Sequence, residues 1–225
     1  MIQTYADLYD LTIEDVLPLE RMAQKSAENL SLPIRSPNTL NSSEELNFFK
    51  SLNPDIVIVV AYGQIIPKTF LHIPKKGFIN IHASLLPKWR GAAPIQRAII
   101  NLDKEIGISI MKITEELDAG PVMQKIKINI NSLDSSLEVS KKLSKIGSEH
   151  IIQALDDIFN DKAKFVEQEN IFATYAKKIK KEEGKINWEE SAKNIISKIN
   201  DLKQELSQCT EYKKKKIKNI RRQKN

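Results

Sequence analysis

Three side chains with complementary chemistry, Asn80, His82 and Asp118, stand where predicted strands end. An amide can polarise a carbonyl group, an imidazole can carry a proton, and a carboxylate can orient that imidazole. Asn80 and His82 are two residues apart, so on one strand their side chains share a face. The strand stops at Leu85-Leu86-Pro87, because proline cannot donate to a sheet ladder. A polar pair in this place predicts a catalytic site rather than a core.

Each of the three residues has a plainer interpretation when it is taken alone. A histidine at a strand end is most often structural, an asparagine can form a turn, and an aspartate can cap a helix or a turn. The joint pattern favours catalysis for Asn80, His82 and Asp118 over those interpretations. His72 and His150 lack such neighbours, and we expect structural roles for them.

Short apolar runs that alternate with helical patterns predict the fold class. The apolar runs cover residues 55–61, 77–82 and 107–113. The helical patterns cover residues 18–30, 42–52 and 94–101. This alternation predicts an α/β fold with a doubly wound, mostly parallel sheet and a site at the carboxyl ends of its strands. The first run is apolar on both faces, so we expect it to be a central strand.

The second half of the chain predicts further strands and helices. Residues 124–130 alternate polar and apolar side chains, and we expect them to pair with residues 108–113 as a hairpin. An amphipathic helix is predicted over residues 137–159 and a shorter helix over residues 188–199. The polar residues 162–185 between them are predicted to be a connection.

Positive charge is concentrated in the last residues of the chain. Of a net charge of +6, residues 211–225 hold eight basic side chains and one acid, so the rest is close to neutral. We expect the tail from Lys213 onward to be disordered and to add weak, salt-sensitive affinity for RNA. The single Cys209 excludes an internal disulfide framework, and no run approaches the ~18 apolar residues of a membrane span. We expect a cytoplasmic monomer without a membrane segment or a metal site.

The run from Gly77 to Gly91, followed by Leu117-Asp118-Ala119-Gly120, resembles the folate-dependent formyltransferases. Their shared pattern is Asn-x-His-x-Ser-Leu-Leu-Pro with a downstream Asp-x-Gly. Within that superfamily, four further segments are similar to the methionyl-tRNA formyltransferases: Val59–Gly63, Arg90–Arg97, Thr174–Ile179 and Ile186–Trp188. The resemblance covers roughly residues 20 to 200.

The resemblance implies a Rossmann-like core that uses no metal. Its reaction would move a formyl group from 10-formyltetrahydrofolate to the amino group of initiator methionyl-tRNA, in translation initiation. By this resemblance Asn80 would polarise the formyl oxygen, and His82 would be an acid/base or oxyanion donor. Asp118 would hold His82 and accept the amine proton through water.

The resemblance also implies positions that bind folate and tRNA. The residues expected near the folate are Ala61, Tyr62, Gly63, Ser84, Leu85, Leu86 and Pro87. Arg90 and Gly91 are expected beside the acceptor end of the tRNA. Ser84 can equally be a turn hydroxyl, Gly63 a turn glycine and Arg90 a surface arginine.

Both ends of the chain depart from the family pattern. The family begins with a strand and a Gly-Thr-Pro-x-Phe-Ala turn and ends in a β-barrel that grips tRNA, and neither pattern occurs here. We therefore expect a catalytic core at 1–175 that lacks its first strand, a linker at 176–185, and a remnant of the tRNA-binding domain at 186–225. Such ends suggest a truncated or frame-shifted gene. Two alternatives stay open: a non-catalytic remnant, and a formyltransferase that acts on a nucleotide sugar or glycinamide ribonucleotide.

Overall fold

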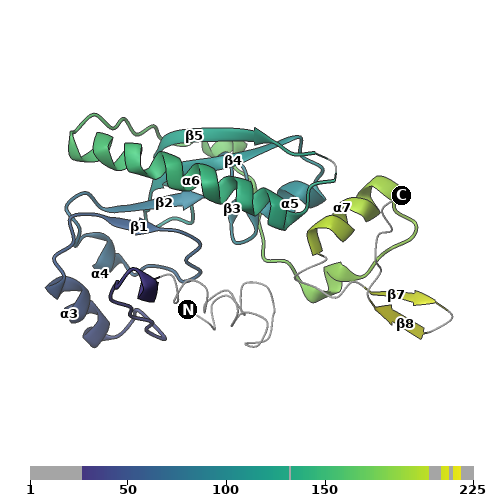
Figure 1. Ribbon diagram of the computed structural model, residues 1–225, viewed down its shortest axis with the longest axis horizontal. Helices are drawn as coiled ribbons and strands as arrows, with labels where there is room; N and C mark the ends of the chain where they lie inside the picture. Colours follow the sequence, from purple (N-terminus) through teal and green to yellow (C-terminus); the bar gives the residue numbers. More distant parts are fainter. Residues whose placement is uncertain (1–26, 132, 203–208, 213–214, 219–225) are drawn as a thin grey trace.

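The computed structural model describes residues 27–131, 133–202, 209–212 and 215–218. Its main feature is a four-stranded sheet in the order β1-β2-β4-β5. These strands are β1 Val57–Val59, β2 Phe78–His82, β4 Glu105–Lys112 and β5 Val122–Asn129. The helices are α3 Ser43–Ser51, α4 Lys68–Leu71, α5 Pro94–Ile100, α6 Ser136–Phe159 and α7 Ala192–Leu202, with short 3-10 turns at Asn170–Phe172 and Lys181–Gly184. Figure 1 shows α6 lying across one face of the sheet.

The sheet is mixed in direction. β1 and β2 are parallel, whereas β4 runs antiparallel to both β2 and β5. The α/β class is confirmed, and so is the expected hairpin, in which Ile108 pairs with Ile126. The antiparallel β2–β4 pair differs from the mostly parallel sheet that we expected. The seven residues of α5 span only about 10 Å, too little to return the chain to the other end of the sheet before β4 begins.

The expected central position of the first apolar run is not met in the described part of the chain. There β1 has a neighbouring strand on one side only, and its three residues are half-buried. A strand that helices cover on both faces would be fully buried. β1 is therefore an edge strand of the sheet that the structure describes.

α6 packs its apolar stripe against the sheet and fixes which face carries polar groups. Buried residues of α6 and of the sheet pack together in two clusters. In the first, Val139 and Leu143 of α6 meet Ile106 and Ile108 of β4. In the second, Ala154 and Ile158 of α6 meet Ile79 of β2 and Ile110 of β4. Gly147 permits this close approach, because a Cβ there would lie 3.3 Å from Cγ2 of Ile81. Since Ile79 and Ile81 face α6, the alternating Asn80 and His82 point to the opposite face.

The helices begin where capping residues predict. α3 follows Ser42, whose hydroxyl accepts a backbone N–H, and α6 follows Ser135, which forms a capping box with Glu138. α3, α5 and α6 match the expected helices to within a residue at each end, while the last helix begins later than expected, at Ala192. The helix expected at residues 18–30 falls mainly outside the described residues. None of the helices in the described ranges has the length and apolarity that a membrane crossing needs.

Two short strand pairs lie outside the main sheet. β3 (Arg90–Gly91) pairs in parallel with β6 (Tyr175–Ala176), which joins the loop after β2 to a segment far along the chain. β7 (Cys209–Tyr212) and β8 (Lys215–Lys218) form an antiparallel pair. The expectation of disorder from Lys213 onward is wrong for β8, whose residues pair with β7. The division into domains at residues 175 and 185 stays a prediction.

Candidate catalytic site

His82 is the last residue of β2 and is only 6% exposed. Its Nε2 atom lies 2.9 Å from the carbonyl oxygen of Trp89. Its Nδ1 atom lies 3.6 Å from Oδ2 of Asp118. The two ring nitrogens therefore face two different loops, the one after β2 and the one after β4. The structure brings together two of the three residues that the sequence motif singles out.

The contact with Trp89 determines which ring nitrogen of His82 carries a hydrogen. A backbone carbonyl can only accept, so Nε2 of His82 is the donor in this bond. In the neutral ring, Nδ1 then has a free lone pair that faces the carboxylate of Asp118. A proton added at Nδ1 creates a cation that this carboxylate attracts. Nδ1 is thus the atom placed to take up and release a proton.

Asp118 reaches His82 on a loop that returns along the sheet. β4 is antiparallel to β2, with Lys112 opposite Ile79, so β4 ends at the far end of β2 from His82. The loop after β4 folds back and brings Asp118 to His82. There Oδ2 of Asp118 accepts the backbone N–H of Gly91 at 2.8 Å. The sequence predicted that Asp118 lies at a strand end beside His82. In the structure Asp118 does lie beside His82, but the loop after β4 brings it there and not the end of the strand.

Asn80 shares a face of β2 with His82. In the pairing with β4, Asn80 lies opposite Met111 and His82 lies opposite Ser109. Asn80 is half-buried, and within the described residues its side-chain amide has no hydrogen-bond partner. A half-buried amide without a partner is unfavourable unless a ligand or water satisfies it. The Asn80 amide is therefore available to the carbonyl group of a substrate.

The loop between β2 and β3 is held by two buried hydroxyl groups, that of Ser84 in the loop and that of Ser109 in β4. Oγ of Ser84 donates to the carbonyl of Lys88 at 2.5 Å. Oγ of Ser109 donates to the carbonyl of Ser84 at 2.7 Å and accepts the N–H of Leu86 at 3.0 Å. Ser84 and Leu86 are fully buried. Their placement favours a turn hydroxyl for Ser84 and core packing for Leu86 over the expected contact with folate.

The other positions expected near the folate are half-buried or exposed. Leu85 and Pro87 are half-buried, and the peptide bond before Pro87 is cis. Residues Ala61–Gly63 follow β1, which is parallel to β2, so they lie at the same end of the sheet as His82. Partial burial raises the pKa of the Tyr62 phenol above its usual value. Contact of these residues with a folate stays a prediction.

Arg90 lies inside the protein and not on its surface. It is 3% exposed. Nε and Nη2 of Arg90 donate to Oε1 of Gln168 at 3.1 and 2.9 Å, and Nη2 also donates to Oδ1 of Asn170 at 2.7 Å. A phosphate contact and a solvated surface arginine, the two alternatives from the sequence, both need an exposed guanidinium. The burial of Arg90 favours support of the neighbouring loop.

Gly91 acts on the site through its backbone. Its φ of 113° is a conformation that favours glycine, and a Cβ there would lie 3.0 Å from the carbonyl oxygen of Ala176. The same carbonyl accepts the N–H groups of Ala92 and Ala93 at 2.9 and 3.2 Å. This close approach of β3 to β6 directs the Gly91 N–H at Asp118.

Three residues that the motif did not single out support the site. Ser109 left a signal in the sequence, because it is a lone serine inside the apolar run 107–113. Trp89 supplies the carbonyl for His82, and its Nε1 donates to Oδ2 of Asp103 at 2.7 Å. Gln168 left no signal, because it acts on a loop 50 residues earlier in the chain.

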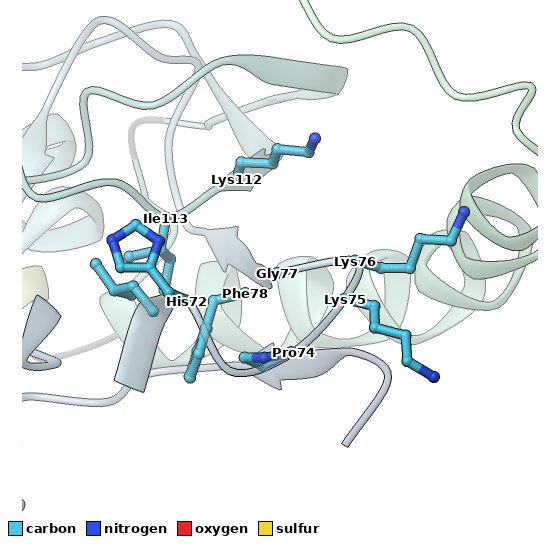
Figure 2. A pocket seen from close by; sticks show the side chains of 9 residues that line it. His72, Pro74, Lys75, Lys76, Gly77, Phe78, Lys112 and Ile113 are labelled. Carbon is cyan, nitrogen blue, oxygen red and sulfur yellow. The ribbon is translucent and has the colours of Figure 1, made fainter. Parts of the chain in front are cut away.

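A hollow of about 380 Å³ lies at the other end of β2, away from His82. Its lining includes His72, Lys75, Lys76, Gly77 and Lys112. Figure 2 shows the side chains of Lys75 and Lys76 pointing away from His72. Lys75 pairs with Asp55 at 3.2 Å and Lys76 with Asp161 at 2.6 Å, so both cations already have a carboxylate. Across the described residues, no group of three or more His, Cys, Asp or Glu side chains is arranged to hold a metal ion.

Comparison with known proteins shows the family of this sequence. A family model described as formyl transferase matches residues 13–155. The methionyl-tRNA formyltransferase of Pelagibacter ubique (strain HTCC1062) is 57% identical over 177 residues. That alignment covers 78% of this chain and 57% of the relative, so the chain spans little more than half the relative's length.

Solved structures show the same fold. A 4-N formyltransferase from Francisella tularensis has a TM-score of 0.71 and 21% identity, over 92% of this chain and 84% of that one. WlaRD, a sugar 3N-formyl transferase solved in the presence of dTDP and 5-N-formyl-THF, has a TM-score of 0.64 and 21% identity. The match covers 79% of this chain and 61% of the WlaRD chain.

Proposed function

Because the chain belongs to the formyl transferase family, we propose that it transfers a formyl group from 10-formyltetrahydrofolate to the amino group of initiator methionyl-tRNA. The 57% identity to a methionyl-tRNA formyltransferase carries this proposal. The acceptor is thus a translation-initiation substrate, and the folate is a co-substrate. We also propose that the protein is a monomer and that it works in the cytoplasm. Size-exclusion chromatography tests the first point, and cell fractionation tests the second.

Asn80 stabilises the intermediate in the proposed reaction. The amine nitrogen attacks the formyl carbon, and the formyl C=O bond becomes a C–O⁻ group in a tetrahedral intermediate. The half-buried amide of Asn80, which has no partner within the described residues, donates to that oxygen. A donor that meets charge as it develops lowers the barrier more than it tightens binding of the ground state.

His82 and Asp118 carry the proton in the proposed reaction. Attack leaves one surplus proton on the amine nitrogen, and Nδ1 of His82 takes it, directly or through a water. Asp118, 3.6 Å away, stabilises the resulting imidazolium. The proton then passes to N10 of the folate as the carbon–N10 bond breaks. Tetrahydrofolate leaves with the hydrogen that the amine lost, so protons and charge balance.

The proposed folate position lies beside Ala61–Gly63 and Leu85–Pro87. Ala61 and Gly63 are exposed at the end of the sheet that holds His82, so their backbone groups can meet the hydrogen-bonding edge of a pterin. Tyr62 is half-buried between them. The buried Ser84 and Leu86 keep the loop in shape below this position.

The acceptor is tested with the purified chain. The chain is incubated with 10-formyltetrahydrofolate and either methionyl-tRNA or a dTDP-linked amino sugar, and formylated product is measured by mass spectrometry. We expect formyl-methionyl-tRNA and no formylated sugar. Formylation of the sugar alone would contradict methionyl-tRNA as the acceptor. If neither acceptor gave a product, the result would contradict formyl transfer by this chain.

A further inference from the structure

Gln168 joins the two loops that meet at His82. Its Nε2 atom donates to the carbonyl oxygens of Asp118 at 2.8 Å and Gly120 at 2.7 Å. Its Oε1 atom accepts Nε and Nη2 of Arg90 at 3.1 and 2.9 Å. Both amide hydrogens and both lone pairs of the side chain are therefore used at this one place.

The loop that carries Asp118 needs such support. Asp118 has a φ of 47°, in the left-handed region that is unfavourable for a residue with a Cβ. Backbone strain of this kind persists when the surrounding structure holds the residue in place. Gln168 binds the carbonyls of Asp118 and Gly120, and so it holds the first and the third peptide units that follow the Asp118 side chain.

The loop that carries Arg90 is tied to the same carboxylate. Arg90 is followed by Gly91, whose N–H donates to Oδ2 of Asp118 at 2.8 Å. The hydrogen bond that Gln168 accepts from Arg90 and the one that it donates to the Asp118 carbonyl therefore close a ring with the Gly91–Asp118 bond. Loss of the Gln168 hydrogen bonds would therefore release both Arg90 and the Asp118 loop.

We propose that Gln168 is a positioning residue that keeps the Asp118 carboxylate 3.6 Å from His82. This inference rests on the proposed function, because Asp118 matters to turnover only where it serves His82. Gln168 touches neither reacting group and acts through the backbone of the Asp118 loop. It keeps the proton-carrying pair assembled before substrate arrives.

The first test reads the position of the loop without turnover. Gln168→Glu keeps an acceptor for Arg90 and removes both donors to the loop. Gln153→Glu is the matched control, because Gln153 is exposed on α6 and donates only to Asp157 at 3.2 Å. Hydrogen exchange of the Gly91 N–H is measured by NMR on the full chain. We expect it to be ~10-fold faster in Gln168→Glu and unchanged in Gln153→Glu, with the β4 amides protected as in the parent.

The second test reads the reaction. In the formylation assay, Gln168→Glu is expected to lower kcat ~10-fold and to change the KM values for methionyl-tRNA and folate by less than ~2-fold. Unchanged Gly91 exchange, or faster Gly91 exchange with unchanged kcat, would overturn the positioning role. Faster exchange throughout β4 would overturn it in favour of a general loss of stability. A parent chain that forms no product counts against the proposed function alone, and the exchange measurement then decides the role of Gln168.

Discussion

The two ends of β2 each have a histidine nearby, and the surroundings of the two rings differ. His82 is 6% exposed and meets a carbonyl through Nε2 and a carboxylate through Nδ1. His72 lies at the other end, in the lining of the hollow, where it is exposed and its ring has no hydrogen bond within the described residues. Proton transfer needs a ring whose orientation is fixed. Burial with fixed partners, rather than the presence of a hollow, is therefore what distinguishes the end of β2 that we propose to be catalytic.

The polar contacts at the two ends differ in the same way. Around His82, the side chains of Ser109 and Arg90 are buried. Ser109 connects β4 with the loop after β2, and Arg90 connects β3 with Gln168, far along the chain. Around the hollow, the carboxylate of Asp161 is 84% exposed in its pair with Lys76. Breaking a buried hydrogen bond leaves a group without a partner, whereas water replaces the partner in an exposed ion pair. Substitutions should therefore have large effects at the His82 end of β2 and small effects at the end with the hollow.

The largest difference is expected for the two histidines. His82→Ala should lower kcat/KM for formylation by ~10³-fold, because it removes the group that moves the proton. His72→Ala is the matched control and should stay within ~2-fold of the parent. Both variants are compared by initial rates, with circular dichroism as a check of folding. Similar losses in the two variants would remove the basis of the comparison.

Asn80→Ala should have the next largest effect. It removes a donor to the developing oxyanion, so we expect kcat to fall ~10²-fold while the KM for the folate changes little. Steady-state kinetics with the folate concentration varied separate the two parameters. A raised KM with unchanged kcat would show that Asn80 binds the ground state and has no role in the transition state.

Ser109→Ala tests the buried hydrogen bonds below the site. It leaves the Ser84 carbonyl and the Leu86 N–H without their partner, and we expect a loss of ~2–3 kcal/mol in the free energy of unfolding. Ser148→Ala is the control, because Ser148 is exposed on α6 and bonds only within its own helix. It should change stability by less than ~0.5 kcal/mol in urea unfolding. Equal costs for the two serines would mean that the loop does not depend on Ser109.

The half-exposed pair of Arg97 and Glu183 predicts a pH dependence of stability. The hydrogen bond from Arg97 lowers the pKa of the Glu183 carboxyl below its ordinary value of 4.5. Because the folded pKa is below the unfolded one, the pair stabilises the fold above about pH 4.5 and loses this contribution as the pH falls further. Solvent screening limits the effect to under ~1 kcal/mol. Glu183→Gln should flatten this part of the acid dependence of Tm, and an unchanged acid dependence would assign it to other carboxylates.

The smallest effect is expected at the hollow. Asp161→Asn removes the charge partner of Lys76 at the surface, and the free energy of unfolding should change by less than ~0.5 kcal/mol. Formylation should keep the rate of the parent. A loss comparable to that of Ser109→Ala would show that the two ends of the strand do not differ as described.

Local patterns in the sequence predicted the elements and much of the site. The apolar runs gave β2 and β4, and the helical patterns gave α3 and α6. The motif led to His82 and Asp118, which lie 3.6 Å apart. Strand and helix periodicities are set by near neighbours, and a single chain displays them directly.

The features that the sequence did not predict depend on contacts between distant segments. The direction of β4 depends on how the short α5 packs, and the burial of Arg90 depends on Gln168 and Asn170, about eighty residues later. The sequence leaves two alternatives open for Ser84, and its bond to Lys88 favours the turn role. Local periodicity carries no information on such pairings.

A double-mutant cycle on His82 and Asp118 tests the central claim that this pair acts as one proton-carrying unit. Formylation of methionyl-tRNA is measured under single-turnover conditions for the parent, His82→Ala, Asp118→Asn and the double variant. Because Asp118 is proposed to act only through His82, we expect the double variant to be no slower than His82→Ala alone. Rate losses that multiply in the double variant, or a parent chain that does not formylate methionyl-tRNA, would contradict this claim.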